Sequence, residues 1–349
     1  MSLINVPTPG NARVLVIVPT HDHHETLALS VRSILEQTIA DIEIVIVGDG
    51  VTPEVRRVAN ELTRVDSRVR FEEHPKSARQ GEPHRDRIIK ESSSPLIAYN
   101  GDDDLWFPDH LESMTALIEN YDFVHPLPIL IDPLGNLIFL PSDLRNPESV
   151  AWHQSATPRN TISLSGVVHS RESYLRLPHG WRTTPHDLWT DHYMWQQFFE
   201  QNWFRGVTAP RATILKLVAF GRELRQPGER ALEIQSWWDR LHSPSFADDW
   251  ENMVRDAMWR MAVNLNVKSA IQEDEIATLR DVIDEKIVAM GESNADRARL
   301  NSELETLRAD VQRTFVELER TRSTISWRLT RPLRAIRRVF PRRHTDHAR

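Results

Sequence analysis

The chain has 349 residues, and its hydrophobic content of 40% can fill a sizeable core in one large or two ordinary domains. It contains no cysteine, which excludes disulfides, thiolate metal sites and cysteine nucleophiles. The formal net charge is −7, although residues 322–349 hold nine arginines and a single acid, Asp346. The acidic body argues against nucleic-acid binding and sets the basic C-terminal segment apart.

The N-terminal stretch MSLINVPTPGNAR has no basic region followed by an apolar one, so it does not resemble a secretory signal. No run of the sequence approaches the ~18 apolar residues that cross a bilayer. We therefore expect a cytoplasmic protein, either free or peripheral on the inner face of a membrane.

Alternating strands and helices are predicted for the first 105 residues. Apolar runs indicate four strands, the first two nearly continuous in β-branched residues, at 14–19, 42–47, 69–73 and 95–100. Between the first two strands, one helix face carries Leu27, Val31, Ile34 and Leu35. This alternation predicts an α/β fold with a doubly wound, mostly parallel sheet.

Residues 106–225 are less regular and rich in proline. They contain short β-like runs at 136–141 and 212–220 and one helical segment at 190–201. We expect this part to complete the same sheet, so that residues 1–225 form the first domain.

Helical segments are predicted for the rest of the chain. Residues 229–265 look helical and form the main part of an extension assigned to 226–268. Over 269–325, apolar residues recur at steps of three, four and seven among dense charges, which predicts a coiled coil interrupted at 291–294. A coiled coil would make the protein a homo-oligomer, whereas a long solvated helix packed on its own domain is the alternative.

The last segment, 326–349, interleaves arginines with Trp327, Leu329, Leu333 and Ile336. This pattern is typical of a basic amphipathic segment that lies on an anionic membrane surface. A solvated tail and an RNA-binding arm are the alternatives.

Three histidines and two acids follow the first strand, in the stretch VIVPTHDHHETL. One interpretation is a zinc motif of the H-x-H-x-D-H type, but Glu25 stands at the aspartate position and Thr26 at the final histidine. The other interpretation is a ligand-binding turn, in which Asp22 caps the next helix and Glu25 completes a capping box. The backbone after Pro19 and Thr20 then faces a ligand, because ligands of open α/β sheets lie at the carboxyl ends of strands.

Acidic residues follow two further strands. Asp49 lies between two glycines, where its carboxylate could accept hydrogen bonds from a base or ribose, and a plain turn is the alternative. Asp102, Asp103 and Asp104 follow the fourth strand, and three adjacent carboxylates repel one another unless a cation neutralises them. Hard oxygen ligands favour Mg²⁺ or Mn²⁺, which bind one or two carboxylates together with substrate phosphates. The sequence therefore predicts a site for a metal and a diphosphate.

The order and spacing of these motifs resemble family 2 glycosyltransferases, which have the GT-A fold. The stretch PTHDHHETLALSVRSILEQT, followed by IEIVIVGDG, is similar to the family's P-T-Y-N-R segment, a helix ending in L-x-Q-T and a strand ending in V-D-D-G-S. GDDDLWFPDHLE resembles D-x-D-D-L-W-x-P-x-x-L, and WTDHYMWQQF resembles the start of the family's E-D helix.

The resemblance implies which residues contact the donor. Pro19, Thr20 and Asp22 of the first turn, and Asp49 after the second strand, fall where the family holds the nucleotide. Arg85, in an H-R-D-R segment where the family usually has R-N, falls among the donor contacts.

The resemblance also implies the residues of the chemical step. Asp102 falls at the ribose contact, Asp103 and Asp104 fall at the metal ligands, and Asp191 falls at the catalytic base. Two positions depart from the family pattern, with Gly101 in place of the first aspartate of D-x-D-D and Thr190 in place of the glutamate of E-D. Thr190 is also the expected N-cap of the helix that carries Asp191.

The implied function is inverting, metal-dependent transfer of a single sugar from a nucleoside diphosphate sugar to an acceptor hydroxyl. The acceptor would be a glycan or a lipid-linked sugar of a cell-surface polysaccharide pathway. A Q-x-x-R-W motif, which the family's processive synthases carry, does not follow Asp191. A nucleotidyltransferase is disfavoured because no glycine-rich phosphate loop follows the first strand, and a non-catalytic transferase-like scaffold working through its coiled coil is the main rival.

Overall fold

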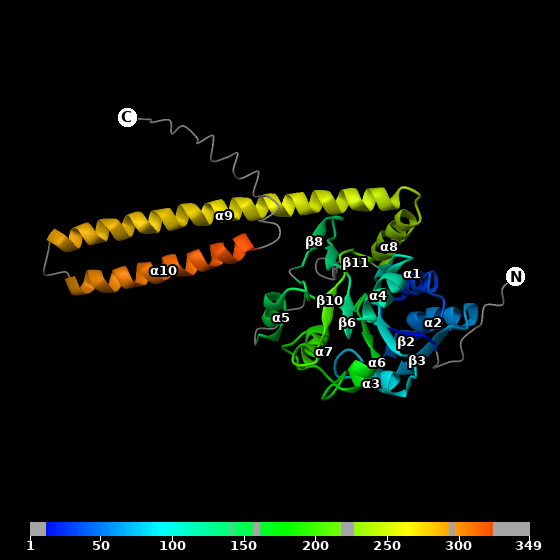
Figure 1. The fold of residues 1–349 in the computed structure, drawn as a ribbon. Helices are drawn as coiled ribbons and strands as arrows, with labels where there is room; N and C mark the ends of the chain where they lie inside the picture. The colour runs from blue at the N-terminus through cyan, green and yellow to red at the C-terminus, as the bar shows by residue number, and fades with distance from the viewer. Residues whose placement is uncertain (1–11, 141, 156–160, 218–226, 293–296, 324–349) are drawn as a thin grey trace. The chain divides into compact units, whose positions relative to one another are not determined.

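The computed structural model describes residues 12–140, 142–155, 161–217, 227–292 and 297–323 (Figure 1). The chain divides into two compact units, Met1–Trp250 and Glu251–Arg349. The domain boundaries expected at residues 225 and 268 stay predictions, and the basic segment 326–349 lies outside the described residues.

The first unit is built on a mostly parallel sheet, which confirms the predicted α/β fold. Its seven strands within the described residues follow the order β10-β6-β9-β4-β1-β2-β3, and β9 runs antiparallel between β4 and β6. The strands are β1 (Val14–Thr20), β2 (Ile42–Asp49), β3 (Val69–His74), β4 (Leu96–Tyr99), β6 (Phe123–His125), β9 (Val168–Ser170) and β10 (Gly206–Thr208).

A smaller sheet adjoins the carboxyl end of β4. Its strands follow the order β5-β11-β7-β8, with bounds β5 (Leu105–Trp106), β7 (Ile129–Ile131), β8 (Leu137–Phe139) and β11 (Ile214–Leu217). The helices of the first unit are α1 (His24–Leu35), α2 (Pro53–Val65), α3 (Glu82–Glu91), α4 (His110–Ile118), α5 (Pro147–Gln154), α6 (Arg171–Leu175), α7 (Thr190–Phe199) and α8 (Pro227–Leu241).

Both faces of the large sheet are covered, because successive residues of β1 point to opposite sides. Val14, Val16 and Val18 pack in one cluster with residues of α1, α2 and α4, whereas Leu15 and Ile17 pack in a second cluster with residues of α3 and α7. Two covered faces explain why the central strands read as continuous apolar runs. They also leave the carboxyl ends of the strands as the place for polar side chains.

The second unit consists mainly of two helices, α9 (Phe246–Glu292), whose first residues belong to the first unit, and α10 (Arg297–Ser323). The two helices run antiparallel, since Lys286 pairs with Glu303 and Arg322 pairs with Glu273. The break between them coincides with the interruption predicted at 291–294. The described part of the coiled-coil segment thus pairs within one chain, and a homo-oligomer stays a prediction.

Three local predictions were wrong. Helix α1 begins at His24 with His23 at its N-cap, so Asp22 lies one residue too early to cap it. The helical stretch expected at 229–265 is broken between Leu241 and Phe246. The N-cap of α7 is Trp189, which makes Thr190 the first helical residue. Within the described ranges, none of the helices is both long and apolar enough to span a bilayer.

Candidate active site

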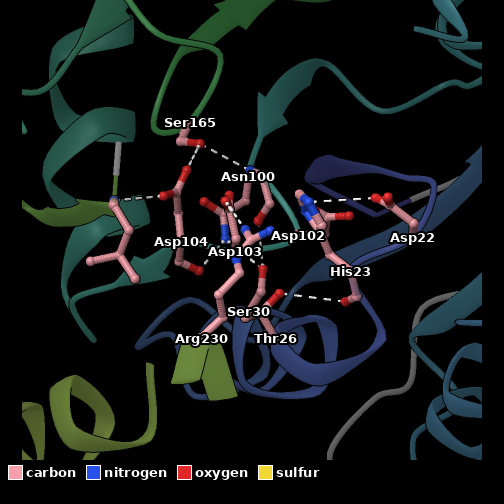
Figure 2. Close-up of polar contacts among 12 residues, drawn as sticks. Asp22, His23, Thr26, Ser30, Asn100, Asp102, Asp103, Asp104, Ser165 and Arg230 are labelled. Carbon is pink, nitrogen blue, oxygen red and sulfur yellow. Dashed lines mark hydrogen bonds and ion pairs between the residues drawn. The ribbon is translucent and has the colours of Figure 1, made fainter. Parts of the chain in front are cut away.

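The acidic cluster lies on the turn that joins β4 to β5, beside the loop between β1 and α1. Figure 2 shows Asp102, Asp103 and Asp104 on this turn, with His23 on one side and Ser165 on the other. Two serines hold the turn in place. Ser30 donates to the Gly101 carbonyl oxygen at 2.7 Å, and Ser165 accepts from the Gly101 N–H at 3.0 Å.

Asp104 is fully buried and points toward β11. Lys216 forms an ion pair with it at 2.7 Å, the Leu217 N–H donates to it at 2.9 Å, and the Ser165 hydroxyl is a third donor. Burial raises the pKa of Asp104 to about 6, although Lys216 acts in the opposite direction. Its predicted role as a metal ligand is untested, and in this structure its carboxylate anchors the turn to β11.

Asp102 and Asp103 point into the site instead. His23 Nδ1 donates to Asp102 at 2.9 Å, and Arg230 of α8 donates to Asp103 at 3.0 Å. Ligand atoms of His23, Asp102 and Asp103 all lie within 4.8 Å of one another. Burial alone would lower the pKa of His23, but the two carboxylates outweigh it and raise the pKa to about 9.

This group suits a divalent cation. Two carboxylates and one imidazole nitrogen are hard and borderline ligands, which bind Mn²⁺ and related ions. The charge of Asp103 is balanced in this structure by the guanidinium of Arg230, and both side chains are mostly buried. Asp103, an expected metal ligand, and Asp102, expected at the ribose contact, are therefore the residues that could hold Mg²⁺ or Mn²⁺, and His23 could join them. The ribose contact of Asp102 stays a prediction.

Asp49 lies at the end of β2. Its carboxylate accepts hydrogen bonds from Lys76 at 2.5 Å and from the Ser77 N–H at 2.6 Å. Burial alone would raise the pKa of Asp49, but these donors outweigh it and hold the pKa below its usual range. His21 Nδ1 also donates to the Asp49 carbonyl oxygen at 2.8 Å. Asp49 thus fixes the loop before α3, and its contact with a base stays a prediction.

Pro19 and Thr20 of the first turn offer little polar side-chain surface. Pro19 is half-buried within β1, and Thr20 is buried with a hydroxyl oxygen that lacks a hydrogen-bond partner among the described residues. Asp22 is exposed, and its carboxylate lies 3.5 Å from His23 Nε2. Its role as a donor contact stays a prediction.

Asp191 lies on α7 and Arg85 lies on α3. Both helices cover the sheet face to which Leu15 and Ile17 point. Asp191 is half-buried and accepts a hydrogen bond of 2.9 Å from the Leu164 N–H. Burial raises the pKa of Asp191 above its usual range, while the charge of Arg85 limits the rise. Arg85 is 1% exposed and stacks on Trp181, and its Nε has no partner within the described ranges.

Lys216 connects the two halves of the site. Its ammonium pairs with Asp104, and its pKa is raised by Asp104, Asp103 and Asp191, although burial acts against this. Two carboxylates of the turn after β4 and the carboxylate of Asp191 thus all favour the charged form of this one ammonium group. A lysine inside the apolar run ATILKLVAF was the only sequence signal for this residue, and Arg230 had none.

Gly101 shows how tightly the turn is packed. A Cβ atom there would lie 2.9 Å from Asp104 Oδ2, 3.1 Å from Ser165 Oγ and 3.2 Å from Asp103 Oδ1. An aspartate at this position would therefore collide with the groups that hold Asp104. The turn as packed therefore suits a glycine at this position.

Comparison with known proteins places these residues in a family context. Residues 15–174 match the family model for glycosyl transferase family 2. An uncharacterised glycosyltransferase of Rickettsia bellii is 30% identical over 118 residues, covering 33% of this chain and 16% of that protein. The UDP-Glc:alpha-D-GlcNAc-diphosphoundecaprenol beta-1,3-glucosyltransferase of Escherichia coli is 28% identical over 116 residues, covering 32% of this chain and 44% of that protein. The chain thus spans less than half the length of these two relatives.

Among solved structures, TarS residues 1–349 of S. aureus in complex with UDP-GlcNAc is similar to this chain with 15% identity and a TM-score of 0.46. The similarity covers 66% of this chain and 67% of that one. The fold assignment above is based on the strand order of the present chain and not on this similarity.

Proposed function

We propose that this chain, whose residues 15–174 match the family model for glycosyl transferase family 2, transfers one sugar from a nucleoside diphosphate donor to an acceptor hydroxyl, with inversion and with a divalent cation. The observation that carries the proposal is the cluster at the turn after β4, where ligand atoms of His23, Asp102 and Asp103 lie within 4.8 Å of one another. A leaving diphosphate needs a cation and an attacking hydroxyl needs a base, and we assign these roles to this cluster and to Asp191.

In the proposed reaction, Asp191 accepts the proton of the acceptor hydroxyl as that oxygen attacks the anomeric carbon. A raised pKa suits this role, because a base works best when its pKa is near the working pH. The Leu164 N–H holds one carboxylate oxygen and leaves the other for the acceptor.

The donor's diphosphate would lie at the turn after β4. Asp102 and Asp103 would hold Mg²⁺ or Mn²⁺, which supplies several kcal/mol of stabilisation for the charge on the departing diphosphate. Arg85 and the first turn at Thr20 are proposed to contact the donor, and the unpaired Arg85 Nε is consistent with this.

For the acceptor we propose a glycan or lipid-linked sugar of cell-surface polysaccharide synthesis. The name of the Escherichia coli relative describes transfer to a diphosphoundecaprenol-linked sugar, which supports this class of acceptor. A peripheral position on an anionic membrane would bring the site to such an acceptor, and the sequence of 326–349 favours it.

The proposal is tested with the full chain and a panel of UDP-, GDP- and dTDP-sugars. We expect at least one donor to raise the melting temperature, and to raise it further with Mn²⁺. Calorimetry should show that Asp103→Ala loses Mn²⁺-dependent donor binding, whereas Asp109→Ala, which removes a more exposed acid of the neighbouring loop, keeps it. If no donor binds the parent protein, the chain is a non-catalytic scaffold and the proposal is wrong.

A further inference from the structure

We propose that His23 is itself a ligand of the divalent cation, and that its nitrogen makes the site prefer Mn²⁺ and Co²⁺ to Mg²⁺. This inference rests on the proposed function, because it concerns the same cation. It adds a third protein ligand from the loop between β1 and α1 to the two from the turn after β4.

The position of the ring supports this assignment. Nδ1 is the nitrogen that faces the carboxylates, at 2.9 Å from Asp102 Oδ1, and ligand atoms of His23, Asp102 and Asp103 lie within 4.8 Å of one another. Ligands at about 2.1 Å from an octahedral ion are about 3.0 to 4.2 Å apart. The cation would replace the Nδ1 proton that Asp102 now accepts, with release of that proton to solvent, and side-chain shifts of under about 1 Å would then bring the three groups into one coordination sphere.

The second ring nitrogen of His23, Nε2, also lies near a carboxylate. Nε2 lies 3.5 Å from the carboxylate of Asp22 (Figure 2). Metal-bound histidines usually donate their second N–H to a carboxylate, a carbonyl or water, which fixes the orientation of the ring. His23 thus has carboxylates near both ring nitrogens. Asp102 and Asp103 are in position to share a metal with Nδ1, and Asp22 is in position to orient the ring through Nε2.

The choice of metal follows from the ligand atoms. Mg²⁺ prefers oxygen ligands and gives up its water reluctantly, whereas imidazole nitrogen suits first-row transition ions. Replacing His23 by asparagine puts an amide oxygen, in place of the imidazole nitrogen, near the same position. The variant should therefore bind Mg²⁺ about as well as the parent protein and lose its preference for Mn²⁺.

The test is titration of the full chain with Mn²⁺ and with Mg²⁺, together with electron spin echo spectroscopy of the Mn²⁺ complex. We expect nitrogen modulation from a directly bound imidazole in the parent, loss of this signal in His23→Asn and His23→Gln, and a fall of roughly tenfold or more in the ratio of Mn²⁺ to Mg²⁺ affinity. The matched control is His24→Asn, since His24 is the next histidine and lies near Glu25 instead.

The outcomes separate this inference from the proposed function. If both His23 variants keep the nitrogen signal and the affinity ratio, while Asp103→Ala loses Mn²⁺, then His23 is not a ligand and the cation site stands. If the parent protein binds neither ion, with or without a nucleotide, both the His23 assignment and the metal-dependent reaction are wrong. Circular dichroism of each variant confirms that the comparison is made between folded proteins.

Discussion

Arg230 and Asp103 form an ion pair of 3.0 Å between helix α8 and the turn after β4. The guanidinium would compete with the proposed cation for this carboxylate. Once displaced, it would lie near the turn where the donor's diphosphate is proposed to bind.

Replacing Arg230 by methionine should strengthen Mn²⁺ binding in the absence of nucleotide. Methionine keeps an apolar stem but removes the competing charge, and a hydrogen bond to a charged group contributes about 1.5 kcal/mol, which corresponds to roughly tenfold in affinity. Calorimetric titration with Mn²⁺ measures this directly. Arg240→Met on the same helix, where Arg240 stacks on Trp237, should leave the affinity unchanged. Unchanged or weaker Mn²⁺ binding by the Arg230 variant would count against competition for Asp103.

Asp191→Asn should lower turnover by roughly 10²-fold or more while donor and Mn²⁺ affinities stay nearly constant. The amide can still accept the Leu164 N–H but cannot take the acceptor's proton. Steady-state rates and calorimetry separate the two effects. Asp187→Asn, which changes an exposed acid of the preceding loop, is the control and should keep full activity. A variant with more than a tenth of the parental turnover would show that Asp191 is not the base.

Gly101→Ala should destabilise the protein, because the added methyl group meets Asp104 at 2.9 Å and Asp104 is held in place by Lys216. Overpacking of this kind costs about 1–3 kcal/mol, which urea unfolding can resolve. Gly228→Ala in α8 is the matched control, since an added Cβ there meets nothing within 4 Å. Equal stability of the two variants would mean that the turn has room for a side chain.

Stability should depend on pH through His110, which is completely buried at the start of α4. Burial lowers its pKa to about 3, compared with about 6.5 in the unfolded chain. Between these values the unfolded chain binds a proton that the folded chain does not, so the free energy of unfolding falls as pH falls below about 6.5. From pH 7 to pH 5 this one histidine contributes a loss of about 2 kcal/mol.

His110→Asn should therefore lose about 2 kcal/mol less than the parent protein between pH 7 and pH 5, as measured by urea unfolding. The exposed His179 should make no such difference when it is replaced by asparagine. If the parent and the His110 variant lose stability in parallel, His110 is not held neutral by burial.

Sequence periodicity predicted the central strands and their order along the chain because buried parallel strands are apolar on both faces. It also placed the acids at the correct edge of the sheet. The pairing of these acids was not predictable, since Lys216 and Arg230 reach Asp104 and Asp103 from more than 100 residues away. Asp22 matched a capping sequence, yet the helix begins later, and its carboxylate lies beside His23 instead.

Release of nucleoside diphosphate from a labelled nucleotide sugar by the full chain, with Mn²⁺ and then with a chelator, tests the central claim most directly. We expect a donor selected by thermal shift to be cleaved slowly in water and faster with a suitable acceptor, the chelator to stop cleavage, and Asp191→Asn to cleave the donor at least roughly 10²-fold more slowly. Cleavage that continues at the same rate in the chelator, or a donor that binds and is never cleaved, would contradict it.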